Sequence, residues 1–205
     1  MAVTRRPAVF LDKDGTLVED IPYNVDPTRI RLMPDAGSAL RSVAGNGYRL
    51  VVVSNQSGVA RGLFSEPAVR GVERRLRELL EAEGVELDGF LYCPHLADGS
   101  VPSYARECQC RKPKPGLLMR AAEELSLDVE ESWMVGDILD DVEAGRAAGC
   151  RTLLVEVGNE TEWVRSEARE PDVVVPSLAA AAIAIRGAGG VPASMWAACV
   201  ARRSA

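Results

Sequence analysis

The sequence predicts an α/β fold with a doubly wound parallel sheet. Short, largely apolar runs, of which residues 48–53 with their three consecutive valines are an example, alternate along the chain with segments of helical periodicity. A strand that is apolar at every position is buried on both faces, as parallel strands between two helix layers are. Polar motifs follow several of these runs, and such a sheet binds its ligands at the carboxyl ends of its strands.

The first half of the chain is expected to supply three strands and two helices. One helix runs over residues 34–45 and ends at Gly45, and a second runs over residues 65–84 and ends at Gly84. Residues 18–33 contain two prolines and no sustained periodicity, so we expect an excursion over the ligand crevice. The expected strands are residues 8–11, 48–53 and 90–92.

The second half continues the alternation after a long break. Residues 93–114 form an irregular polar connection, and its length indicates a function or a stabilising ligand. A helix over residues 115–125 follows, and another ends at Gly149. We expect one domain over residues 1–186 without a large cap domain, and a flexible tail over residues 187–205. The remaining expected strands are 133–135, 151–157 and 173–175, the last two each followed by a helical stretch.

Composition excludes several classes of function. The 205 residues are 47% hydrophobic and 26% charged, as in a globular protein. The longest apolar run, residues 178–185, is shorter than the roughly 20 residues that span a bilayer. No apolar core of the length found in signal peptides follows Arg5 and Arg6, so no signal peptide is visible. The net charge of −6 argues against nucleic acid. We therefore expect a cytoplasmic monomer that binds neither nucleic acid nor a membrane.

Acidic and basic side chains near the strand ends could meet at one edge of the sheet. Asp12 and Asp14 follow the first strand and Asp137 follows a later one, and carboxylate oxygens suit Mg²⁺. Ser54 and Lys112 offer a hydroxyl group and a cation to a phosphate. In this arrangement Asp12 attacks phosphorus, while Asp14 protonates the leaving alkoxide and later deprotonates water.

Four segments, in chain order, resemble the signature motifs of the haloacid dehalogenase (HAD) superfamily of phosphatases. They are Asp12-Lys-Asp14-Gly-Thr-Leu, Ser54-Asn55, Lys112 and Gly136-Asp137-x-x-x-Asp141. The resemblance implies that Asp12 is the nucleophile and Asp14 the general acid and base. It also implies that Mg²⁺ is held by the side chains of Asp12 and Asp137 and the main-chain carbonyl of Asp14. Ser54 and Lys112 would bind the phosphoryl group, with Asp141 supporting the site from behind.

Three cysteines and the only histidine of the chain fall within the irregular segment: Cys93, His95, Cys108 and Cys110. These are the residue types of a tetrahedral Cys₃His zinc site, and because protein fills all four positions the zinc would be structural. The alternatives are buried thiols or a redox pair of Cys108 and Cys110. Zinc would order the loop of residues 93–110 and position Lys112 just beyond it.

This zinc loop narrows the resemblance to the D,D-heptose 1,7-bisphosphate phosphatases, which are similar to the histidinol-phosphate phosphatases. The resemblance implies a small phosphorylated sugar as substrate and removal of its 7-phosphate. Ile138 stands where a heptose enzyme is expected to have a basic residue, so a histidinol-phosphate phosphatase is an alternative. A phosphotransferase and a catalytically silent binding scaffold are further alternatives. The implied substrate contacts are Asp20, Tyr23, Asn55, Gln56, Ser57 and Arg111.

Overall fold

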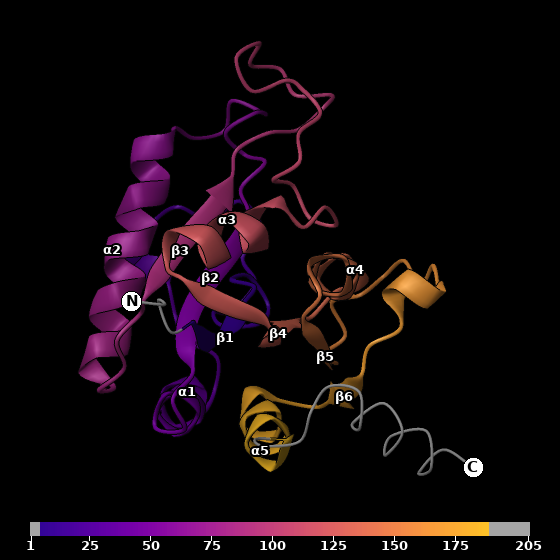
Figure 1. The fold of residues 1–205 in the computed structure, drawn as a ribbon. Helices are drawn as coiled ribbons and strands as arrows, with labels where there is room; N and C mark the ends of the chain where they lie inside the picture. The colour runs from indigo at the N-terminus through magenta and orange to yellow at the C-terminus, as the bar shows by residue number, and fades with distance from the viewer. Residues whose placement is uncertain (1–4, 189–205) are drawn as a thin grey trace.

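The computed structural model describes residues 5–188, in which six parallel strands form one sheet with helices on both faces (Figure 1). The strand order is β3-β2-β1-β4-β5-β6, which puts β1 in the middle of the sheet. The strands are β1 (Arg6–Leu11), β2 (Arg49–Asn55), β3 (Gly89–Cys93), β4 (Leu127–Gly136), β5 (Arg151–Val155) and β6 (Val173–Val175). The α-helices are α1 (Ala36–Ala44), α2 (Glu66–Ala82), α3 (Gly116–Glu124), α4 (Leu139–Ala148) and α5 (Leu178–Ala188).

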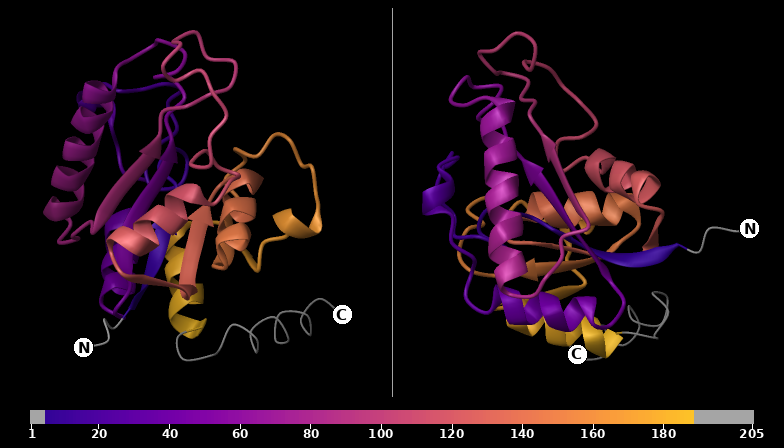
Figure 2. Two further views of the ribbon diagram at one scale, coloured as in Figure 1. Left: turned by 45° about the horizontal axis from the view of Figure 1, so that its top comes forward. Right: turned by 90° about the vertical axis from the view of Figure 1, so that its left-hand side faces the viewer.

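The two faces of the sheet carry separate hydrophobic cores, because successive side chains of a strand point to opposite sides. Val9 and Leu11 of β1 face the core that α1, α2 and α5 cover. Phe10 faces the other core, which α3 and α4 cover (Figure 2). Each large apolar side chain buried in this way contributes about 1.5–3 kcal/mol. The strand β1 therefore has a fixed position, and so has the loop that follows it.

The predicted fold class is confirmed, and the one strand whose start differs by several residues is β4. It begins at Leu127, which pairs with Arg6, whereas the sequence predicted a strand only from residue 133. Residues 128–131 are polar or half-exposed, so they lack the apolar signal of a buried strand although they belong to β4. Backbone pairing, which a hydrophobicity pattern does not report, defines the first part of β4.

The prediction of a helical stretch after β5 is wrong. Residues 156–166 are irregular, and only a short 3₁₀ turn, η2 (Glu167–Arg169), follows before β6. None of the side chains of residues 156–172 is buried, so the segment has no apolar stripe that could hold a helix against the sheet. This segment instead passes the carboxyl end of β4, where two of its side chains enter the site described below.

The end of the described chain is helical. The helix α5 continues to Ala188, two residues past the predicted domain boundary at residue 186. The rest of the predicted tail, residues 189–205, lies outside the described residues. Among residues 5–188 no helix combines the length and the apolar character that crossing a bilayer requires.

The close packing of α4 on the sheet at Gly145 can be tested by substitution. Replacing Gly145 with alanine should destabilise the fold by about 1–3 kcal/mol. The added methyl group would lie 2.6 Å from Cβ of Met134 and 2.8 Å from Cγ2 of Thr152. Gly187→Ala is the matched control, since that methyl group meets no described atom within 4 Å beyond its chain neighbours and the backbone of its own helix. Urea unfolding measures both variants, and a wild-type stability for Gly145→Ala would contradict this packing.

Candidate active site

The carboxyl ends of three adjacent strands, β2, β1 and β4, bring the predicted site residues together. Asp12 directly follows β1, and its main-chain N–H donates to the carbonyl of Val135 at 2.9 Å, which continues the pairing with β4. Ser54 lies near the end of β2, and Asp137 directly follows β4. Asp12, Ser54 and Asp137 are all buried. The sheet itself therefore places the candidate nucleophile beside the candidate metal and phosphate ligands.

Lys112 reaches into the centre of this group. Its Nζ donates to Oδ1 of Asp12 and to the main-chain carbonyl of Val53 at 3.0 Å, and it lies 2.6 Å from Oδ1 of Asp141. The side chain is 2% exposed. Burial alone lowers the pKa of this lysine, but the carboxylates of Asp12 and Asp141 outweigh burial and raise it above its ordinary value. Lys112 is therefore charged, and its charge is directed at Asp12.

Three buried carboxylates, those of Asp12, Asp137 and Asp141, lie together, and two of them, Asp12 and Asp137, are the predicted side-chain ligands of Mg²⁺. One oxygen of each lies within 4.8 Å of the others. Burial and the nearby charge of Asp12 raise the pKa of Asp137 to about 6, although hydrogen bonds from Asn159 and Thr16 lower it. Burial also raises the pKa of Asp141. An all-oxygen donor set with this excess of negative charge fits Mg²⁺.

Two glycines make room for this cluster. At Gly15, which has a φ of +83°, an added Cβ would lie 2.3 Å from Oδ2 of Asp137. At Gly136 an added Cβ would lie 2.2 Å from Oδ2 of Asp141. Any larger residue at either position would displace a carboxylate of this cluster. The glycines of the two motifs thus have a steric function in the site.

Asp14 lies two residues beyond Asp12 in a different environment. Its Oδ1 accepts from Nζ of Lys13, and its Oδ2 accepts from Nε2 of Gln56 at 3.3 Å. Burial raises the pKa of Asp14, with an opposing contribution from Lys13 and a reinforcing one from Asp12. Gln56 also donates to Oγ of Ser54 at 2.8 Å, which orients that hydroxyl group. A raised pKa favours the protonated carboxyl group that a general acid needs.

A cavity of 110 Å³ opens beside Asp14. Five of the six predicted substrate contacts line it, namely Asp20, Tyr23, Asn55, Gln56 and Ser57. Arg111, the sixth, does not line it and is partly buried, with a buried Nη1 that has no hydrogen-bond partner among the described residues. The cavity wall also includes Phe64, whose ring lies so close to Gly58 that an added Cβ there would be 2.1 Å from it.

Sequence reasoning missed several residues of the site. Thr16 donates to Oδ1 of Asp137 at 2.8 Å, and Asn159 donates to its Oδ2 at 2.8 Å. Glu160 accepts from the main-chain N–H of Leu139 at the start of α4. Asn159 and Glu160 belong to the segment for which a helical stretch was predicted, and no pattern in the sequence connects them to Asp137. Thr16 stands inside the first motif, where its hydroxyl group could have been recognised as a donor.

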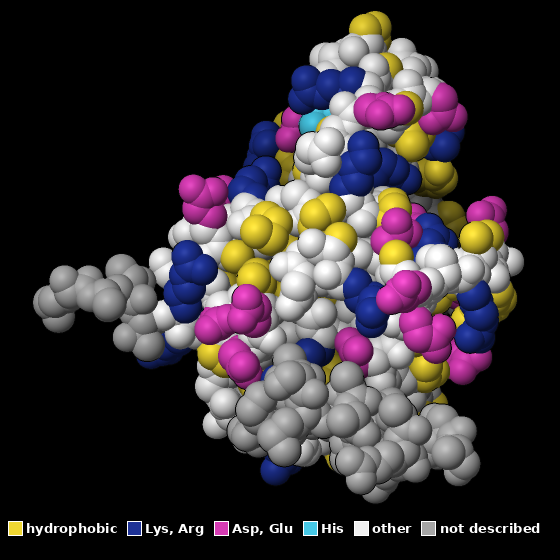
Figure 3. All heavy atoms as spheres, turned by 45° about the vertical axis from the view of Figure 1, so that its right-hand side comes forward, with side chains coloured by type: hydrophobic (Ala, Val, Ile, Leu, Met, Phe, Trp, Pro, Cys, Tyr) yellow, Lys and Arg dark blue, Asp and Glu magenta, His cyan; other side chains and the backbone are white. Residues whose placement is uncertain are grey.

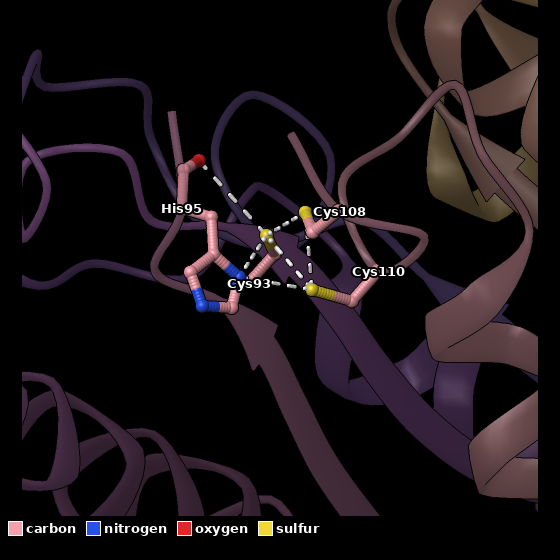
Figure 4. Close-up of side chains that lie close together, drawn as sticks. All are labelled: Cys93, His95, Cys108 and Cys110. Atoms are coloured by element: carbon pink, nitrogen blue, oxygen red, sulfur yellow. Dashed lines mark hydrogen bonds between the residues drawn. The ribbon is translucent and has the colours of Figure 1, made fainter. Parts of the chain in front are cut away.

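The four predicted zinc ligands meet at one point beyond β3 (Figure 4). The distances between neighbouring Sγ atoms of Cys93, Cys108 and Cys110 are 3.2–3.5 Å, and Nδ1 of His95 lies 3.3 Å from Sγ of Cys110. Ligand bonds of about 2.1–2.3 Å imply tetrahedral edges of about 3.6–3.8 Å, so slight outward movement admits zinc. A redox pair would use two of these side chains and leave the other two unexplained.

Hydrogen bonds connect the zinc loop to two neighbouring segments, the loop after β2 and the first turn of α2. The N–H of Val101 donates to the carbonyl of Ala60 at 2.9 Å, and the hydroxyl of Ser100 donates to the carbonyl of Arg61 at 2.9 Å. The carboxylate of Glu66, in the first turn of α2, accepts hydrogen bonds from the hydroxyls of Tyr92 and Tyr104. Figure 3 shows the histidine of this loop at the surface, with Lys and Arg side chains beside it.

Zinc binding can be tested by substitution. The purified protein should contain about one zinc ion per chain, and Cys110→Ser should lose most of it because one of four ligands is gone. The phosphatase activity that the sequence motifs predict should fall at the same time, since Lys112 stands two residues beyond Cys110. Cys150→Ala is the control. Cys150 is buried and is not part of the cluster, so this variant should keep its zinc. Metal analysis showing full zinc in Cys110→Ser would contradict the assignment.

Comparison with known proteins agrees with this geometry. The model of the HAD-hydrolase-like family matches residues 109–181. The D-glycero-β-D-manno-heptose-1,7-bisphosphate 7-phosphatase of Yersinia pestis is 41% identical over 153 residues, which are 74% of this chain and 81% of that protein. The protein of the same name from Photorhabdus laumondii is 39% identical over 183 residues, covering 88% of this chain and 96% of that one.

A solved structure extends the comparison to three dimensions. The D,D-heptose 1,7-bisphosphate phosphatase of B. bronchiseptica, complexed with magnesium and phosphate, is 29% identical and has a TM-score of 0.75. The similarity covers 88% of this chain and 98% of that one. Because the curated relatives named above are 39–41% identical and most of their length is covered, the chain belongs to the D-glycero-β-D-manno-heptose-1,7-bisphosphate 7-phosphatase family of HAD-like hydrolases.

Proposed function

We propose that this protein removes the 7-phosphate of D-glycero-β-D-manno-heptose 1,7-bisphosphate. The observation that carries the proposal is the buried contact between Lys112 and Asp12, beside the carboxylate of Asp137. This arrangement gives a nucleophile, a cation and a metal ligand at one point, as attack on a phosphoryl group requires. The names of the relatives at 39–41% identity support the heptose and its β anomer.

In the first step a carboxylate oxygen of Asp12 forms a bond to phosphorus. The bond between phosphorus and the oxygen on carbon 7 breaks, and that oxygen takes the proton of the Asp14 carboxyl group. Ser54 and Lys112 hold the phosphoryl oxygens. The raised pKa of Asp14 supports its role as general acid, because Asp14 must be protonated before the P–O bond breaks. The products are heptose 1-phosphate and an aspartyl-phosphate on Asp12.

In the second step water attacks the phosphorus of the aspartyl-phosphate. Asp14, now a carboxylate, takes a proton from that water, and the bond between phosphorus and Asp12 breaks. Inorganic phosphate leaves, Asp12 is a carboxylate again and Asp14 is protonated. Gln56 contacts both Asp14 and Ser54, so it holds the carboxyl group of the acid and the phosphate-binding hydroxyl group in fixed positions relative to each other through both steps.

Charge decides whether the first step can occur. A carboxylate and a phosphate at about 4 Å repel by about 4 kcal/mol for each pair of unit charges at an effective dielectric constant of 20. Lys112 offsets part of this repulsion because its ammonium group contacts Asp12 directly. Mg²⁺ bound at Asp12 and Asp137, with the main-chain carbonyl of Asp14, would supply further positive charge.

The cavity beside Asp14 suits the uncharged, hydroxylated part of the sugar between its two phosphates. It contains polar groups, such as Asp20 and Ser57, and apolar ones, such as Ile21 and Phe64, but no lysine or arginine. At 110 Å³ it is smaller than the roughly 300–1,000 Å³ of pockets that enclose a whole small-molecule ligand. It would therefore take the hydroxylated carbons next to the leaving oxygen. The second phosphate would lie outside it, where we place Arg111.

We also propose that the protein acts as a cytoplasmic monomer. The thiols of Cys93, Cys108 and Cys110 are free, as zinc binding requires and as a reducing compartment maintains. The proposed site draws all its side chains from one chain. Light scattering after size exclusion should give the mass of one chain, 22.0 kDa.

Asp12→Asn should abolish turnover. The amide keeps the shape of the side chain but is a poor nucleophile, so kcat should fall by roughly a thousandfold or more. Phosphate release in the presence of excess Mg²⁺ measures this loss. Asp98→Asn, the same change at an exposed position of the zinc loop, should leave kcat unchanged. Substantial activity in metal-replete Asp12→Asn would remove Asp12 from the mechanism.

A panel of phosphate esters tests the substrate. It contains both anomers of heptose 1,7-bisphosphate, fructose 1,6-bisphosphate and histidinol phosphate. We expect the β-heptose compound to have the highest kcat/KM, at least tenfold above the α anomer, a difference of about 1.4 kcal/mol. A higher kcat/KM for histidinol phosphate would overturn the proposed substrate and leave the proposed chemistry in place.

A further inference from the structure

The side-chain amide of Asn55 forms two hydrogen bonds with the main chain of a single residue, Lys112. Nδ2 of Asn55 donates to the carbonyl of Lys112 at 3.0 Å, and the N–H of Lys112 donates to Oδ1 of Asn55 at 3.0 Å. The two residues are 57 positions apart in the sequence. A carboxamide is suited to this pairing because it offers a donor and an acceptor in one plane.

Lys112 needs such an anchor because its main chain belongs to neither a strand nor a helix. It lies in the irregular connection between β3 and α3, four residues before α3 begins at Gly116. Its side chain nevertheless has to bring Nζ into contact with Asp12. A shift of the main chain by about 1 Å can cost on the order of a hundredfold in rate when it misplaces a reacting group.

Asn55 is well placed to resist such a shift. It is the last residue of β2, and it pairs with Cys93, the last residue of β3 and a predicted zinc ligand. The zinc cluster holds the chain at Cys110, and Asn55 holds it two residues later. The sequence led us to expect Asn55 among the substrate contacts, and it does line the cavity, but both functional groups of its amide face Lys112.

We propose that Asn55 is a positioning residue for Lys112, fixing the main chain so that the ammonium group meets Asp12 and the transferred phosphoryl group. The inference rests on the proposed phosphatase function for its kinetic consequence. Its structural consequence is independent of any activity, because the anchor exists in the absence of substrate. The two consequences are therefore tested separately.

The structural test is hydrogen exchange at the N–H of Lys112. In Asn55→Ala this N–H loses its acceptor, so its exchange should accelerate at least tenfold in peptides that span residues 110–116. Pro113 and Pro115 have no N–H, so few amides contribute to the signal. Asn55→Asp keeps an acceptor and should keep slow exchange. Asn46→Ala, at a distant exposed amide bonded to Ser42, is the control and should not alter these peptides. Unchanged exchange in Asn55→Ala would overturn the anchor.

The kinetic test is a double-mutant cycle between Asn55→Ala and Lys112→Gln. We expect Asn55→Ala alone to lower kcat by about 10- to 100-fold, equally for the heptose bisphosphate and for p-nitrophenyl phosphate. In the Lys112→Gln background it should lower kcat by less than about threefold, because the group it positions is gone. Equal losses in both backgrounds, or an increase in KM for the sugar alone, would overturn the positioning role.

A wild-type protein without phosphatase activity would refute the proposed function, while the exchange result would still decide on the anchor.

Discussion

The ion pair between the ammonium group of Lys112 and the carboxylates of Asp12 and Asp141 is the interaction on which the rest of the site depends. All three side chains are buried, and an isolated charge in such a place would be several kcal/mol unfavourable. The pairing keeps Lys112 charged, and it keeps a cation next to the one carboxylate that must approach a phosphate. Stability and reactivity thus place the same requirement on these residues.

Much of the surrounding structure holds the two sides of this pair in place. The central strand β1 and its pairing with β4 fix Asp12, and Gly136 leaves room for Asp141. Lys112 comes from an irregular segment, so it depends on other supports. These are the cluster of cysteines and histidine at the start and end of the loop and the amide of Asn55 at Lys112 itself. A connection without regular structure can therefore carry a residue that needs a defined position.

Patterns local in sequence predicted most of the fold and the centre of the site. Apolar runs located the strands, and the spacing of Cys93, His95, Cys108 and Cys110 predicted the cluster that the structure forms. Contacts between distant segments were beyond that reasoning. Asn159 donates a hydrogen bond to Asp137 from a segment that is irregular because it lacks an apolar stripe. Asn55 is bonded to Lys112, which lies 57 residues further along the sequence. Such contacts follow from strand order and loop closure, which no local pattern reports.

The most direct test of the account is to trap the covalent intermediate. Enzyme in excess is mixed with heptose 1,7-bisphosphate labelled in the 7-phosphate, quenched in acid within one turnover, digested and analysed by mass spectrometry. The account predicts a phosphoryl group on the peptide that contains Asp12, appearing before free phosphate and absent from Asp12→Asn. Release of labelled phosphate within that turnover, with no phosphoryl group on Asp12 at any time point, would contradict it.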